Sequence, residues 1–255
     1  MTHSYWFKQS FEGDASEEAV KNVLSDRQVF RFKNHPRDEQ DLIRYFFNNQ
    51  TTGFYVDVGA NHPTVQSQSY HLEQIGWSGI LVEPLPDCAD LLRQQRSGIV
   101  VQAACSNKAN HHKELDLVVA GGHSTLNNAP IALASEGNGT IKVQCRTLDS
   151  ILEENDVPTQ FEFLSIDIEG HELDLFDGFD LNKWQPSLIL LEDHVVSHDK
   201  HKHLQANDYQ LIMRTGLNSW YVPASENYKL SWPSRFEQFR KYWLGLYFRK
   251  LRYRK

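Results

Sequence analysis

The sequence predicts an α/β fold in which a doubly wound, mostly parallel sheet is closed by an antiparallel hairpin. Three observations lead to this fold class. Short apolar runs typical of buried strands alternate with amphipathic stretches, several of these runs end in an acidic residue, and two β-like runs close together follow the last of them. The length of 255 residues is enough for one large hydrophobic core.

The first half of the chain alternates helices and strands. Pro36 opens a predicted helix with acids near its start and apolar residues at helical spacing, and Gly53 returns the chain to a central strand. Gly76 is placed as a helix stop. The elements predicted as far as residue 106 are a strand at 54–58, a helix at 69–76, a strand at 79–84, a helix at 88–95 and a strand at 99–106.

Residues 107–145 break this rhythm, because glycine and asparagine clusters separate short β-like runs. We interpret them as antiparallel additions or as a lid over the site. The later predicted elements are a helix at 147–155, a strand at 161–170, a helix after it, a strand at 186–195, and hairpin strands at 209–215 and 219–223. Near the N-terminus the pattern is weak and allows a helix at 16–24 and a strand at 29–33.

We expect three parts in the chain. They are an N-terminal helical extension over 1–50, one domain over 51–223, and a basic amphipathic helix over 224–255. The three cysteines, Cys88, Cys105 and Cys145, are odd in number and far apart, which indicates a reducing cytoplasm rather than a disulfide framework. The N-terminus lacks a signal-peptide pattern, and no apolar stretch is long enough to span a bilayer.

The net charge of −7 is unevenly distributed. Residues 235–255 hold eight basic residues and one acid, a net charge of +7, so the remaining chain carries −14. An acidic body argues against nucleic-acid binding, and a basic tail favours an anionic partner. The tail also repeats apolar residues at three- and four-residue steps, which is typical of a helix at a membrane surface. The alternative is a helix that packs on the body or on a second copy in a homodimer.

Four predicted strands end in acids: Asp57, Glu83, Asp167 with Glu169, and Glu192 with Asp193. Because the carboxyl ends of parallel strands share one edge of a sheet, these residues are expected to converge on a ligand site. The alternative is that acids follow strands because strands emerge into water. The direct succession of apolar run and acid in each case favours a site.

The turn after the central strand contains Gly59, which permits a close backbone approach. Glu83 follows it by about 20 residues, a spacing that suits an acid bonded to ribose hydroxyls. Pro63 stands where a dinucleotide-binding turn has a later glycine, so little room is left for a pyrophosphate. The pattern therefore favours a nucleoside ligand without phosphates and disfavours a nicotinamide-dependent oxidoreductase.

Four segments in this order, YVDVGANHP, GWSGILVEP, FLSIDIEGHELDLFDGFDL and PSLILLEDH, resemble the FkbM family of S-adenosylmethionine-dependent methyltransferases. The resemblance covers residues 36–223. It implies a class I methyltransferase fold, which is Rossmann-like, and methyl transfer to a hydroxyl oxygen of a sugar or a natural product. The implied cofactor-binding residues are Asp57, Gly59 and Asn61 for the methionine portion, Ser69 near the cofactor carboxylate, Glu83 for the ribose, and Ala104 and Ser106 beside the adenine.

Methyl transfer to a sugar hydroxyl needs in-line positioning and removal of a proton. His194 and His171 are the candidate bases, because imidazole is the side chain suited to proton transfer near neutral pH. Asp167, Glu192 and Asp193 resemble the divalent-metal site of catechol-type O-methyltransferases, and Asp167 is also a catalytic candidate. Oxygen ligands suit Mg²⁺ or another divalent metal. The alternative is that these acids bond to backbone or cofactor and hold no metal.

The predicted function is O-methylation of a sugar hydroxyl, in a bacterial lipopolysaccharide, O-antigen or other surface glycan. The expected partner is a glycan or lipid-linked glycan, and the expected place is the cytoplasm, with a peripheral location on the inner membrane if the tail binds lipid. Fold alone does not decide the substrate. Two alternatives are methylation of a small secondary metabolite and an inactive methyltransferase-like module that binds a partner.

Overall fold

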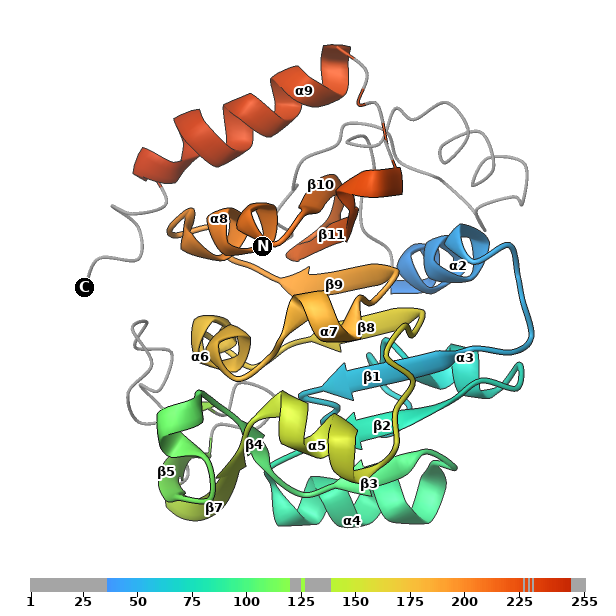
Figure 1. The fold of residues 1–255 in the computed structure, drawn as a ribbon, viewed down its shortest axis with the longest axis vertical. Helices are drawn as coiled ribbons and strands as arrows, with labels where there is room; N and C mark the ends of the chain where they lie inside the picture. The colour runs from blue at the N-terminus through green and yellow to red at the C-terminus, as the bar shows by residue number, and fades with distance from the viewer. Residues whose placement is uncertain are drawn as a thin grey trace. The chain divides into compact units, whose positions relative to one another are not determined.

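The computed structural model describes residues 36–119, 125–126, 139–226, 228, 230 and 232–248, and they form an α/β fold. Parallel strands that alternate with helices, followed later in the chain by antiparallel strands, confirm the predicted fold class (Figure 1). The chain divides into two compact units, Thr52–Ser187 and the segments on either side of it. The helix expected at 16–24 and the strand expected at 29–33 lie outside the described residues.

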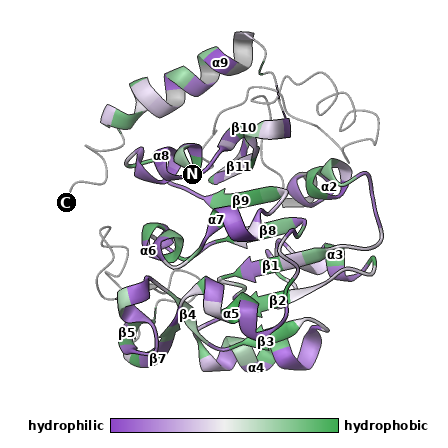
Figure 2. Ribbon diagram, viewed as in Figure 1, coloured by the Kyte–Doolittle hydropathy of each residue, from purple (hydrophilic) through white to green (hydrophobic). Residues whose placement is uncertain are grey.

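The unit Thr52–Ser187 is built on β1, Phe54–Val58. β1 pairs in parallel with β2, Ser78–Val82, and with β8, Phe163–Ile166, while β2 pairs in parallel with β3, Ile99–Val101. β1, β2 and β8 are buried along most of their length, and Figure 2 colours their residues by hydropathy. The helices of this unit are α3 Tyr70–Glu73, α4 Pro86–Gln95, α5 Leu148–Glu154, α6 Glu172–Asp177 and α7 Leu181–Trp184.

The sequence that interrupts the alternation forms a second, four-stranded sheet. Its strands lie in the order β4-β7-β5-β6, with bounds Ala104–Cys105, Thr140–Arg146, Glu114–Val118 and Thr125–Leu126. A short 3₁₀ helix at Lys108–Asn110 connects β4 to β5. β5 pairs antiparallel with β7 and β6, so antiparallel additions are confirmed.

The strand expected at 99–106 is in fact two strands in two sheets. β3 ends at Val101 beside β2, and β4 begins at Ala104, where it pairs with Cys145 of β7. The apolar run is continuous in the sequence, but Ala104 and Cys145 share a small hydrophobic cluster of the second sheet with Leu117 and Val143. Packing in that cluster, which periodicity does not report, decides where the run breaks.

The other unit contains α2, Pro36–Phe46, and β9, Leu188–Glu192. The predicted closing hairpin is confirmed, since β10, Tyr209–Thr215, and β11, Asn218–Pro223, pair antiparallel, and β11 pairs antiparallel with β9. Buried Leu42, Ile43 and Phe47 lie on the apolar side predicted for the first helix. Short helical turns and helices complete the unit: α8 Asp199–Ala206, a 3₁₀ turn at Ala224–Glu226, and α9 Trp232–Phe239.

The helical C-terminal segment continues beyond α9. A π-helical turn spans Arg240–Leu244, and residues 245–248 are helical again. The tail residues after 248 lie outside the described part, so the predicted extent of this helix to 255 stays a prediction. Within the described residues, each helix is too short or too polar to cross a membrane.

Candidate functional site

The turn after β1 is shaped by Gly59. Its φ of +85° lies in the left-handed region, and its N–H donates to the carbonyl of Val82 at 2.9 Å. A Cβ at this position would lie 1.8 Å from the backbone carbonyl oxygen of Asp167. No side chain fits there, because β1 and the residue after β8 approach each other backbone to backbone. Asn61, at φ +48°, completes the sharp reversal.

Glu83 follows β2 and holds this turn in place. One carboxylate oxygen accepts the N–H of Asn61 and the other accepts the N–H of Leu85, each at 2.8 Å. Burial raises the pKa of Glu83, and the nearby charge of Asp57 acts in the same direction. A carboxylate offers about four acceptor positions. Two therefore remain, which fits the predicted pair of bonds to the hydroxyls of a ribose.

Asp57 lies within β1, one residue before its end, and its side chain is buried. The hydroxyl of Ser69 donates to Asp57 at 2.5 Å. Burial raises the pKa of Asp57, while hydrogen bonds from Ser69 and Ser165 and the charge of Arg96 oppose that rise. Asp57 thus ties β1 to the loop before α3. The contact of Asp57 and Ser69 with a cofactor stays a prediction.

The buried guanidinium of Arg96, just after α4, was not anticipated from the sequence. Its Nε donates to Glu73 at 2.7 Å, and its Nη2 donates to Ser69 at 3.0 Å. Its Nη1 donates to the carbonyl of Pro63 at 3.0 Å. Arg96 therefore fixes the loop that runs from the glycine turn to α3. The sequence does not distinguish Arg96 from Arg93, three residues earlier, whose side chain is exposed.

Ala104 lies in β4 of the second sheet, and Ser106 directly follows that strand. Ala104 is packed in that sheet's hydrophobic cluster, and Ser106 is fully buried. The N–H of Ser106 donates to the carbonyl of Arg146 at 2.9 Å, and its hydroxyl accepts from Asn110 at 3.0 Å. The hydroxyl thus bonds within the protein. The predicted place of these two residues beside an adenine stays a prediction.

The segment after β8 carries three of the predicted polar residues. Asp167 is exposed, and its N–H donates to Val58 of β1 at 2.9 Å. Glu169 is buried with φ +49°, a conformation that non-glycine residues adopt rarely and that is enriched at functional sites. His171 is buried at the start of α6, with its Nδ1 at 3.2 Å from Asp174. This unit therefore brings one exposed and two buried polar groups to the end of β8.

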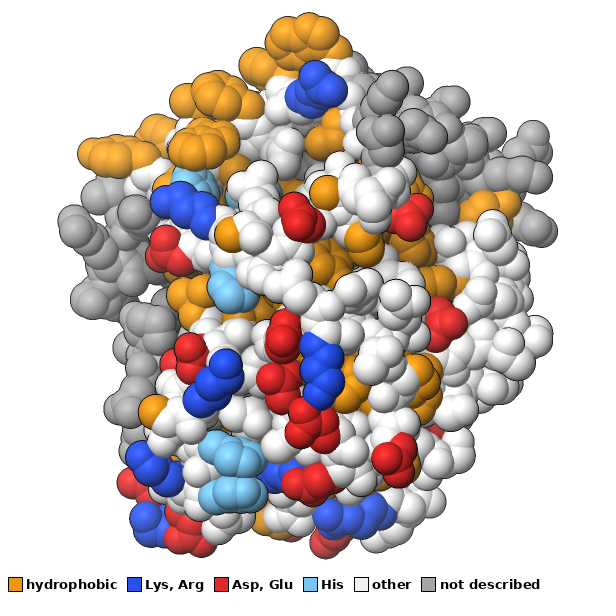
Figure 3. All heavy atoms as spheres, viewed as in Figure 1, with side chains coloured by type: hydrophobic (Ala, Val, Ile, Leu, Met, Phe, Trp, Pro, Cys, Tyr) orange, Lys and Arg blue, Asp and Glu red, His pale blue; other side chains and the backbone are white. Residues whose placement is uncertain are grey.

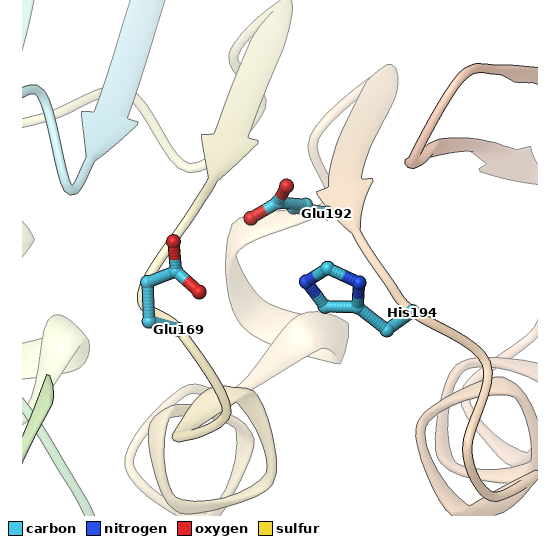
Figure 4. A group of neighbouring side chains, drawn as sticks. All are labelled: Glu169, Glu192 and His194. Atoms are coloured by element: carbon cyan, nitrogen blue, oxygen red, sulfur yellow. The ribbon is translucent and has the colours of Figure 1, made fainter. Parts of the chain in front are cut away.

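The end of β9 presents its residues to opposite sides. Glu192 and His194 are half-buried, and a carboxylate oxygen of the first lies within 4.8 Å of a ring nitrogen of the second. Both side chains project to the same side of the chain in Figure 4, which also draws Glu169 on the turn after β8. Alternate residues of an extended chain face the same way. Asp193, between them, is consequently directed elsewhere.

Asp193 is buried among cations. Its carboxylate lies 2.8 Å from Nζ of Lys200 and accepts the N–H of Val195 at 2.9 Å. Burial alone would raise the pKa of Asp193, but the charges of Lys200 and Arg214 outweigh it and lower that pKa. Of the two predicted metal ligands at the end of β9, Glu192 thus lies beside His194 and Asp193 beside Lys200.

A model of the methyltransferase FkbM domain matches residues 57–215 of the chain, from Asp57 in β1 to the end of β10. The chain belongs to this family. The match includes the glycine turn, Glu83 and the ends of β8 and β9, and it ends before α9. This FkbM-family chain matches none of the curated proteins.

Two solved structures are similar to this FkbM-family chain. Methyltransferase FkbM from Methylobacillus flagellatus KT is 13% identical at a TM-score of 0.44, over 80% of this chain and 47% of the other. Precorrin-6y C5,15-methyltransferase from Geobacter metallireducens GS-15 is 13% identical at a TM-score of 0.36, over 85% of this chain and 92% of the other. The chain thus spans about half the length of the first of these proteins.

Proposed function

We propose that this FkbM-family chain is an S-adenosylmethionine-dependent O-methyltransferase that acts on a sugar hydroxyl. The observation that carries the proposal is the Glu83 carboxylate, held by two backbone N–H groups against a turn that only glycine can form. Family membership supports methyl transfer. The sugar acceptor rests on the family resemblance of the four sequence segments.

The turn Gly59–Asn61 and Glu83 would hold the cofactor, which when bound supplies a methyl group on a good leaving group. Glu83 would accept bonds from the ribose hydroxyls with its remaining lone pairs. Arg96 keeps the loop up to Ser69 in one conformation, and a fixed site loses less entropy when it binds a ligand. The chain's contribution to the transfer is mainly positioning.

A sugar hydroxyl is a weak acid, so its proton must be removed in the transition state. We infer that His194 is the general base, because Glu192 on the same side of β9 can accept a hydrogen bond from the imidazole or stabilise its charged form. His171 is the second candidate and is already bonded to Asp174. A divalent metal bound through Glu192 and His194 would be an alternative way to activate the hydroxyl.

Calorimetric titration with S-adenosylhomocysteine, with and without Mg²⁺, tests the cofactor and the metal. We expect binding without metal, and a larger heat with Mg²⁺ would favour the metal alternative. The absence of binding in both conditions would contradict a methyltransferase and leave an inactive binding module. Mass spectrometry of glycan and small-molecule acceptors after turnover would then distinguish a sugar substrate from a secondary metabolite.

His194→Ala is expected to preserve affinity for S-adenosylhomocysteine and to lower turnover by about 10²–10⁴-fold, the usual contribution of a general base. The measurement is the rate of methyl transfer at saturating substrates over a range of pH. His171→Ala is the matched comparison, since it removes the other candidate imidazole. Full activity of His194→Ala together with inactive His171→Ala would move the base to His171.

A further inference from the structure

The helical segment 232–248 carries a stripe of exposed aromatic side chains. Trp232, Phe236, Phe239, Trp243 and Tyr247 recur at steps of three and four residues and are between 47% and 75% exposed. Such spacing places them along one side of a helix. We call these five residues the aromatic face. Figure 3 shows hydrophobic side chains gathered over α9, which Figure 1 locates.

The segment is fastened to its own unit through Tyr242, which is buried. The hydroxyl of Tyr242 lies 3.0 Å from that of Ser219 in β11, and its carbonyl lies 2.5 Å from Nε2 of His198. The ring of His198 also lies against Trp243, with ring centroids 4.4 Å apart. The segment is therefore docked mainly through Tyr242. The aromatic face stays largely exposed, including Trp243, which remains 58% exposed although its ring contacts His198.

The exposed apolar surface here is large. A fully buried aromatic side chain covers about 150–250 Å², so the aromatic face at its present exposure amounts to roughly 600 Å². Exposed Leu244 and Phe248 extend it. The largest apolar patch on a typical monomer is about 300–600 Å² and often has a function. The aromatic face is thus at or above that limit, and its residues lie outside the FkbM-domain match.

The charge around the aromatic face indicates the kind of partner. Arg235 and Arg240 are exposed on the same segment, and residues 235–255 carry a net charge of +7. Aromatic side chains beside basic ones suit the boundary between lipid headgroups and acyl chains, and each Lys or Arg near an anionic surface adds to the attraction. We propose that the aromatic face docks this protein on an anionic lipid bilayer.

A second copy of the chain fits this surface less well. A symmetric dimer through the aromatic face would bring two segments of net charge +7 together. Like charges across an interface are destabilising. An anionic bilayer receives the aromatic side chains and neutralises the cations at the same time, so both properties of the segment are used.

Co-sedimentation of the full chain with vesicles tests the proposal. We expect binding to vesicles of phosphatidylcholine with phosphatidylglycerol, and much weaker binding to phosphatidylcholine alone or at high salt. The combined substitution Trp232→Ser and Trp243→Ser should lower partitioning by at least about tenfold. Leu91→Ser, an exposed apolar residue of α4, is the matched control and should bind as the wild type does.

Charge is tested separately with Arg235→Gln, which should weaken binding to the anionic vesicles by about fivefold. Arg93→Gln, an exposed arginine of α4, is its control and should change nothing. Equal sedimentation of the double tryptophan variant and the wild type would overturn the proposal. A dimer in solution that the same double substitution dissociates would overturn it too, in favour of a second copy. Neither result depends on methyl transfer, so the proposed function is tested independently.

Discussion

At the scale of the residue, Glu83 shows how one side chain can serve both the fold and a ligand. Its two oxygens each accept a hydrogen bond from a backbone N–H, which holds the turn after β1. The remaining lone pairs are then fixed in direction and can accept bonds from a ligand. The acid was predicted from its place at the end of a strand about 20 residues after a glycine turn. The spacing of residues in the sequence does not predict its two backbone partners, the N–H groups of Asn61 and Leu85.

Glu83→Gln should weaken binding of S-adenosylhomocysteine by about 10- to 100-fold. A neutral amide offers one acceptor in place of two and loses charge-assisted bonds, which are worth about 1.5–3 kcal/mol. Calorimetry measures the change in dissociation constant. Glu114→Gln, which alters a carboxylate bonded to Gln144 at the surface, should bind like the wild type. Wild-type affinity in Glu83→Gln would remove Glu83 from the cofactor site.

Arg96 and Arg93 have similar places in the sequence and opposite environments. Arg96→Met should lower the free energy of unfolding by about 3–5 kcal/mol, because it leaves the Glu73 carboxylate without its buried cation. Arg93→Met removes an exposed pair with Asp90 and should cost about 0–1 kcal/mol. Urea denaturation of both variants measures the difference. Equal losses would show that the Arg96 network contributes no more than a surface pair.

At the scale of the element, α8 departs from what its composition suggests. The run HDKHKH at 198–203 is polar throughout, yet Asp199–Ala206 is helical. Helical spacing turns His201 and Leu204 towards the unit, and the ring of His201 lies 3.1 Å from the hydroxyl of Tyr221. Polar composition alone does not reveal that this run is helical or which of its histidines the helix turns inward.

His201 makes the stability of this element depend on pH. The pKa of His201 falls from 6.5 to about 4, mainly because of burial; the charge of His198 acts in the same direction and that of Asp193 opposes it. Between these values the unfolded chain binds a proton that the folded chain does not, so stability is lost as pH falls. When the pH falls from about 7 to about 5, the free energy of unfolding of His201→Gln should therefore decrease by about 2 kcal/mol less than that of the wild type.

Urea denaturation at the two pH values gives the free energies of unfolding. His112→Gln is the control, since it removes an exposed histidine and should follow the wild type. An unchanged pH dependence in His201→Gln would mean that the imidazole is solvated and titrates as in the unfolded chain.

At the scale of the whole molecule, the alternation of strands and helices was predictable because each strand is a short apolar run with its own turn residues. The hairpin β10–β11 and the acids at the strand ends were predictable for the same reason. The break between β3 and β4, the burial of Arg96 and the pairing of Asp193 with Lys200 were not. The strand break and the burial of Arg96 depend on partners more than 20 residues away, and the Asp193–Lys200 pair depends on how the chain folds between β9 and α8. A single-sequence pattern specifies neither.

The two proposals place their ligands on different units of the molecule, and hydrogen exchange can separate them. S-adenosylhomocysteine should slow exchange at 59–69 and 83–88, where backbone N–H groups surround Gly59 and Glu83. Anionic vesicles should slow exchange within 232–248 instead, because the aromatic face leaves water. Phosphatidylcholine vesicles provide the control for lipid without charge. If S-adenosylhomocysteine slowed exchange at 232–248 and left the glycine turn unchanged, both assignments would be wrong. The cofactor would then bind the segment that we assign to lipid, and not the turn that we assign to the cofactor.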